Sequence, residues 1–128
     1  MSDVMNTSAD RDRRQRFGAQ RGRDLYWGIT LGLVVNAATM FMITLGVGVP
    51  KLAITAAIVG SFIFVCINSF DCMDDFKANA DDMGEEERAT HLGKKLLVAP
   101  WGMFKTLVFL IFGAIGICQL QDLWKIFY

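Results

Sequence analysis

The chain has 128 residues, enough for a single domain, and 53% of them are hydrophobic. The formal net charge is zero, and the basic residues are interleaved with acidic ones, which argues against a nucleic-acid-binding surface. The placement of the charges is more informative than their sum, because long stretches of the chain carry none.

The first segment, residues 1–24, holds six arginines, four aspartates and little apolar surface. A segment of this composition cannot bury enough apolar area to fold alone, so we expect a disordered cytoplasmic tail. The apolar run that follows is longer than the core of a cleavable signal peptide. We therefore expect that run to remain in the membrane as an anchor.

The first candidate transmembrane helix begins at Leu25, because no charged residue occurs from there to Pro50. About 20 apolar residues are enough to cross a hydrocarbon core roughly 30 Å thick. Tyr26 and Trp27 stand where aromatic residues anchor a helix at the lipid headgroups. Glycines precede Pro50, a combination that typically ends a helix.

A second uncharged run extends from Leu52 to Phe70. It follows the first so closely that the two helices should form a tight antiparallel hairpin. Its apolar face continues at helical spacing to residue 80, which predicts a projection into the cytoplasm. One short helix over residues 85–97, acidic at its start and basic at its end, should complete a cytoplasmic helical hairpin over about residues 71–97.

The third candidate span lies within residues 96–121, where Lys105 is the one charged residue. Trp101 marks the start of the helix at the headgroups, and Lys105 can extend back to the same level. Trp124 and Tyr128 would anchor the opposite end. The strictly apolar part of this run is shorter, so an interfacial or partly inserted helix is the alternative.

These spans predict an all-α, integral membrane three-helix bundle over residues 25–128. Residues 1–24 and 71–97 then share one side of the membrane and carry eleven basic residues if Lys105 is included. The other side carries Lys51 and Lys125. The positive-inside rule places the N-terminus in the cytoplasm and the C-terminus outside. A bacterial cytoplasmic membrane fits this arrangement, and an organelle membrane is the alternative.

Polar and small residues within the spans are the candidate interaction sites. No ionisable residue lies at mid-membrane depth, which argues against a proton relay or ion-coupled transport. Asn36 should form an interhelical hydrogen bond worth about 1 kcal/mol or less, and small residues permit close helix packing within the chain or with a partner. The predicted packing or partner positions are Gly28, Gly32, Asn36, Gly60, Ser61, Gly113 and Gly116.

No catalytic, cofactor or metal site is predicted. The acidic residues between residues 71 and 87 do not fit a calcium-binding EF-hand loop, and we expect them to form a solvated surface. His91 is the single histidine, and the three cysteines lack metal-ligand spacing.

These features favour a non-enzymatic membrane protein that acts as an accessory, scaffold or assembly subunit of a larger membrane complex. Its expected partners are the lipid bilayer and other membrane subunits or further copies of itself, with no nucleic acid and no small-molecule substrate. The alternative is a homo-oligomeric pore former, such as a holin-like protein or a small channel.

Overall fold

The structure is a computed structural model that describes residues 7–46 and 48–125; within these ranges it contains helices and short connections but no strand. The helices are α1 (Ser8–Leu45), α2 (Lys51–Asp81), α3 (Glu85–Ala89), α4 (His91–Val98) and α5 (Trp101–Trp124). Three of them, α1, α2 and α5, are long and apolar enough to cross a membrane. The all-α fold with three candidate spans is therefore confirmed. The tightness of the first hairpin stays a prediction, since Val47 lies outside the described residues.

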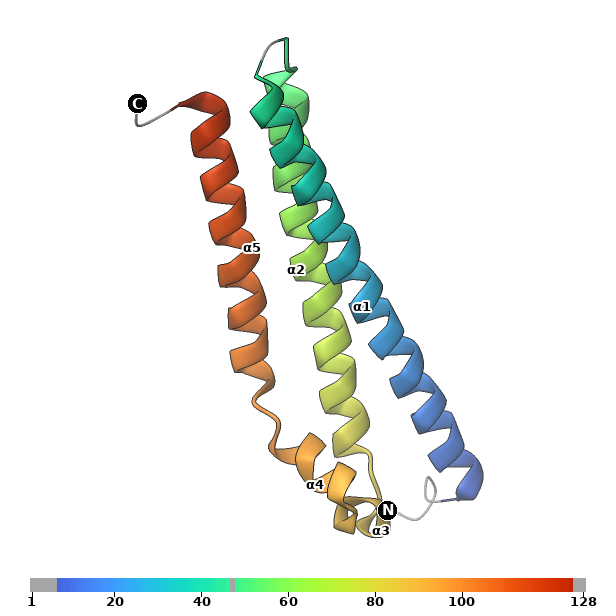
Figure 1. The fold of residues 1–128 in the computed structure, drawn as a ribbon. Helices are drawn as coiled ribbons and strands as arrows, with labels where there is room; N and C mark the ends of the chain where they lie inside the picture. Colours follow the sequence, from blue (N-terminus) through green and yellow to red (C-terminus); the bar gives the residue numbers. More distant parts are fainter. Residues whose placement is uncertain (1–6, 47, 126–128) are drawn as a thin grey trace.

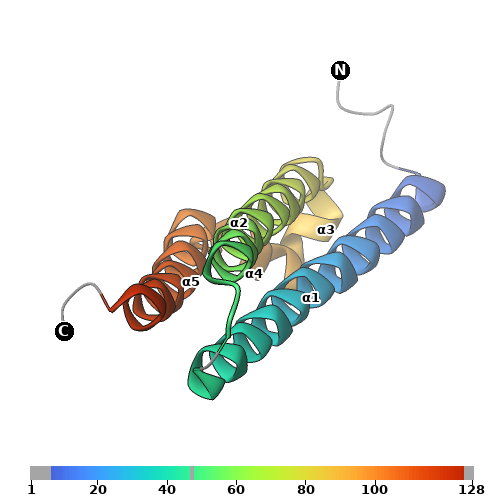
Figure 2. The same ribbon diagram turned by 90° about the horizontal axis from the view of Figure 1, so that it is seen from above.

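The three long helices lie side by side, with α3 and α4 gathered at one end (Figure 1). This charged end comprises residues 8–24 of α1, residues 71–81 of α2, and helices α3 and α4. The opposite turn end holds the connection between α1 and α2 and the end of α5. Helix α1 is inclined to the other two, so it diverges from α5 toward the charged end (Figures 1 and 2).

Helix α1 begins much earlier than its apolar sequence suggests. Thr7 caps the helix: its hydroxyl accepts a hydrogen bond from the Asp10 backbone N–H at 3.2 Å, and the Asp10 carboxylate accepts one from the Thr7 backbone N–H at 3.2 Å. The hydrogen bonds from Thr7 also lower the pKa of the Asp10 carboxyl below its usual value. The expected disorder of residues 1–24 is therefore wrong for residues 8–24, here named the arginine arm. The preceding residues, 1–6, lie outside the described part of the chain.

Close packing of α1 on α2 depends on two glycines. A Cβ atom at Gly28 would overlap the side chain of Asn68. A Cβ atom at Gly32 would overlap Val65 and approach Phe112 to 3.0 Å. Gly32 therefore lies where α1 meets both α2 and α5, and small residues allow the helix backbones to come this close.

The contact of α5 with α2 also places glycines against side chains of the neighbouring helix, but with more space between them. Cβ atoms built at Gly113 and Gly116 would lie 3.6 Å from Phe62 and 3.5 Å from Ile58. The Phe62 ring also meets Phe109 edge-to-face, with centroids 5.4 Å apart. Ile58 belongs to a buried cluster at the turn end that includes Leu123 of α5. Helix α2 thus contacts both other long helices.

The connection from α2 to α5 contains two short helices where one was expected. Thr90 interrupts them with extended backbone angles, φ −68° and ψ 158°. Its hydroxyl donates to the Glu87 carbonyl at 2.6 Å and accepts from the Gly93 N–H at 3.0 Å. Gly93 packs directly against the Glu87 backbone, so the break lets α4 fold back on α3. The expected single helix over residues 85–97 is wrong because this local capping competes with helix continuation.

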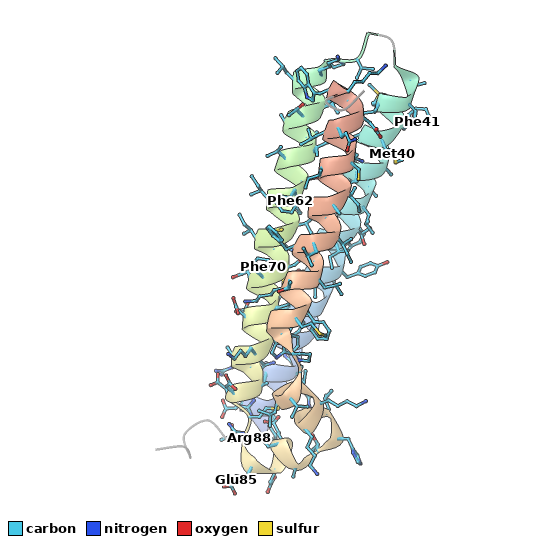
Figure 3. All side chains as sticks on the ribbon, turned by 90° about the vertical axis from the view of Figure 1, so that its left-hand side faces the viewer. Met40, Phe41, Phe62, Phe70, Glu85 and Arg88 are labelled. Atoms are coloured by element: carbon cyan, nitrogen blue, oxygen red, sulfur yellow. The ribbon has the colours of Figure 1, made fainter. Side chains whose placement is uncertain are left out.

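The outer surfaces of α1, α2 and α5 are apolar along much of their length. Met40 and Phe41 project from the turn-end half of α1, whereas Glu85 and Arg88 lie at the charged end (Figure 3). Large aliphatic side chains such as Val34, Ile67 and Leu110 are more than half exposed. A continuous apolar surface of this kind is suited to contact with lipid.

The glycine contacts generate a test of the fold. Gly32→Ala should lower the free energy of unfolding by about 1–3 kcal/mol, because the added methyl group has no room between α1 and α2. Gly60→Ala is the matched control: nothing lies within 4 Å of its added Cβ, so stability should stay equal or rise by up to about 1 kcal/mol. Unfolding in detergent, followed by circular dichroism, would measure both. Equal stability of the two variants would contradict the packing described.

Candidate functional site

A buried polar cluster lies where α1 meets α5. It consists of Asn36, Thr39 and Gln119, whose residues are 7, 6 and 5% exposed. Polar groups in such a setting are stable only when they are hydrogen-bonded, because nothing in an apolar environment replaces water as a partner.

The cluster ties the two helices together through both ends of the Gln119 amide. Gln119 Nε2 donates to the Asn36 backbone oxygen at 2.7 Å, and Gln119 Oε1 accepts from Thr39 Oγ1 at 3.1 Å. Asn36 Nδ2 donates along its own helix to the Gly32 oxygen at 2.7 Å. Asn36 thus contributes its backbone to the interhelical hydrogen bond that its side chain was expected to form.

The side chains of this cluster can form hydrogen bonds but have no catalytic group. Amides and a hydroxyl neither titrate near neutral pH nor act as nucleophiles without an adjacent base. The arrangement therefore holds α5 against α1 and provides no proton-transfer group.

Gln119 is not among the positions predicted from the sequence. A signal for it exists: Phe112, Gly116, Gln119 and Leu123 recur at spacings of three and four residues, and all four are buried. A polar residue in an apolar helix face, in line with a glycine, is typical of an interhelical hydrogen bond.

A second constellation joins the arginine arm to α2. The Arg21 guanidinium donates to the Asp71 carboxylate, and Arg21 Nε lies 2.5 Å from an oxygen of Asp75. The Arg21 side chain is 20% exposed. Arg21 precedes the uncharged segment that starts at Leu25, and its hydrogen bond to Asp71 raises the pKa of its guanidinium above the usual value, in opposition to partial burial.

The arm also contacts α3 and the end of α2. Arg14 pairs with Glu87 at 2.5 Å, and Arg11 pairs with Glu86 at 3.4 Å. Asn79 Nδ2 donates to the Arg14 backbone oxygen at 3.2 Å. Most acidic residues of the charged end are exposed, as expected of a solvated surface, and some of them also pair with arginines of the same chain.

The expected membrane anchors divide into exposed and packed residues. Tyr26 and Trp27 are exposed on α1, as an interfacial role requires. Lys105 pairs with Asp74 at 2.5 Å and lies over the Phe70 ring.

The tryptophans of α5 both contact α2. Trp101 stacks on Phe76 with centroids 5.7 Å apart. Trp124 Nε1 donates to Thr55 Oγ1 at 2.9 Å, and Lys51 Nζ lies 5.4 Å from its ring centroid. Tyr128, the last expected anchor, lies outside the described residues.

The predicted small-residue positions behave differently from one another. Gly28, Gly32, Gly113 and Gly116 are occupied by contacts within the chain. Ser61 is buried, and its hydroxyl donates to the Ile58 oxygen of its own helix at 3.1 Å. Gly60 is exposed, and its partner role stays a prediction.

Among residues 7–46 and 48–125, no three His, Cys, Asp or Glu side chains are grouped so that they could hold a metal ion. Comparisons of the chain with protein-family models, curated proteins and solved structures yielded no match.

The polar cluster generates a stability test. Gln119→Leu should destabilise the bundle by about 0.5–1.5 kcal/mol, because it removes both hydrogen bonds to α1. Thr39→Val, which removes one of them, should have a smaller effect. Unfolding by titration with sodium dodecyl sulfate would measure both, and a Gln119→Leu protein more stable than the parent would contradict this role.

The ion pairs generate a test by amide hydrogen exchange. Arg21→Gln should accelerate exchange within residues 8–22 about fivefold, the effect of losing about 1 kcal/mol of local stability. Arg13→Gln removes the same charge from an exposed residue of the arm outside these ion pairs and serves as the control. Equal acceleration in the two variants would show that total charge, not the Arg21 contacts, orders the arm.

Proposed function

We propose that this chain is a non-catalytic integral membrane protein that serves as an accessory, scaffold or assembly subunit of a larger membrane complex. Its three long helices cross a bacterial cytoplasmic membrane with the charged end in the cytoplasm and the end of α5 outside. The bilayer and other membrane-protein chains are its partners.

The observation that carries this proposal is the small share of helix surface that the bundle itself covers. In the most apolar 18-residue stretch of each helix, only 22% (α1), 28% (α2) and 17% (α5) is buried within the chain. A bundle so open presents most of its apolar side chains to neighbours. The polar groups of the interior, in contrast, are used to hold α1 and α5 together.

The orientation follows from the distribution of basic residues. The charged end carries the arginine arm and four further basic residues on α2, α3 and α4, whereas the turn end carries Lys51 and Lys125. Such an excess of Lys and Arg favours retention on the cytoplasmic side.

The polar residues of the spans support an accessory role over a pore. A pore requires a continuous polar stripe open to water. Thr39 and Gln119 instead bond to each other, and the Thr44 hydroxyl donates to carbonyls of its own helix at 2.7 and 3.1 Å.

Affinity purification tests this function directly. A tagged copy expressed at native level and extracted in mild detergent should recover other membrane proteins in stoichiometric amounts, identified by mass spectrometry. An unrelated tagged three-span protein of similar abundance is the control. Recovery of the chain without other membrane proteins would contradict the accessory role.

A further inference from the structure

One face of α1 and one face of α2, here named their outer faces, are largely exposed within the described chain. On α1, Arg16, Arg23 and Phe41 lie on the side of the helix opposite its glycine contacts with α2. On α2, Asp74 and Asp81 lie opposite its contacts with α1, and Asp74 also reaches Lys105 of α5. The five side chains on these two faces are exposed. Each face therefore carries charged residues at the charged end and apolar residues elsewhere.

The α1 face carries two arginines and the α2 face two aspartates at equal spacing, with Asp12 one turn before Arg16 and Lys77 between the two aspartates. Arg16 and Arg23 are seven residues apart, as are Asp74 and Asp81. Seven residues make about two helical turns, so each pair lies on one side of its helix. Within residues 7–46 and 48–125, Arg16, Arg23 and Asp81 form no side-chain ion pair. Asp74 pairs with Lys105 at 2.5 Å, and its side chain stays 64% exposed.

The charges also lie at matching depths. The register of α1 on α2 places Gly18 beside Asn79 and Arg21 beside Asp75. Arg16 precedes Gly18 by two residues, and Asp81 follows Asn79 by two, so these two charges are level. Arg23 follows Gly18 by five residues and Asp74 precedes Asn79 by five, so these two residues are also level.

We propose that a second copy of this chain packs the outer face of its α1 on the outer face of α2, with Arg16 beside Asp81 and Arg23 beside Asp74. This inference rests on the proposed function, because two copies with one orientation in one membrane share the same depth. Opposite charges at equal depth fix the register of such a contact. The two faces differ, so the contact is head-to-tail and leads to a ring or a row of copies.

The apolar parts of the two faces fit the same register. The exposed Phe41 of α1 is level with Ala56 of α2, which precedes the open Gly60 by one turn. Small residues at that level leave room for the ring of Phe41 from the second copy. Lipid alone would leave Asp81 facing headgroups that are often anionic, a less favourable neighbour than arginine.

Disulfide cross-linking in membranes tests the contact. In a Cys118→Ser background, which removes the exposed native thiol, the double variant Phe41→Cys and Ala56→Cys should give a ladder of dimers and higher species on oxidation. Each single variant should stay monomeric, because a head-to-tail contact does not bring two copies of the same position together. A double variant that stays monomeric would overturn the proposal, because lipid or another protein would then cover these faces. Efficient dimer formation by Ala56→Cys alone would also overturn it.

Charge exchange tests the pairing of residues. Arg16→Asp alone and Asp81→Arg alone should each lower the cross-linked fraction about fivefold, because attraction becomes repulsion. The two changes combined should restore it. Lys95→Asp, an equal change of charge at an exposed residue of α4 outside both faces, is the matched control and should leave cross-linking intact.

Failure to restore cross-linking in the combined variant, or an equal loss in Lys95→Asp, would overturn the pairing. The proposed function is tested separately: absence of the ladder together with stoichiometric recovery of other subunits would reject this contact and leave the accessory role standing.

Discussion

The close approach of α1 to α2 at Gly28 and Gly32 sets the position of the other contacts that α1 makes in the bundle. At Gly28 the Asn68 side chain reaches across, and its amide donates to the Asp24 backbone oxygen at 3.2 Å. At Gly32 the α1 backbone lies against Val65 and Phe112, which brings Asn36 within reach of α5. A larger residue at either glycine would move the arginine arm away from the acids of α2 and withdraw α1 from Gln119.

Two kinds of polar contact then act at the two ends of α1. Toward the turn end, amide and hydroxyl groups bond to one another in an apolar setting, where an interhelical hydrogen bond contributes about 0.6 kcal/mol on average. At the charged end, arginines pair with carboxylates in contact with water, where a single exposed pair contributes about 0–1 kcal/mol. Neither is large alone. Because one continuous helix carries both, they constrain the position of α1 from opposite ends.

The sequence predicts the three long apolar helices well, because the thickness of a bilayer imposes a length that charge-free runs reveal directly. The helical order of the arginine arm is harder to predict, because the composition of residues 8–24 contains no information on the residues they contact. Their order depends on acids such as Asp71 and Glu87, far along the chain. The break at Thr90 depends on a local hydroxyl that satisfies two backbone groups, which periodicity does not detect. Gln119 could be recognised by its spacing from Gly116, but its acceptor on α1 depends on how the helices cross.

The unbroken length of α1 has a mechanical consequence. The helix has 38 residues, which at about 1.5 Å each makes a rod of roughly 57 Å. Its crossing with α2 at Gly28 and Gly32 lies between Arg14 and Asn36 along the helix. A rotation of the rod about this point moves the two residues in opposite directions. A displacement of the charged end of α1 about this crossing would therefore displace Asn36 relative to Gln119 of α5.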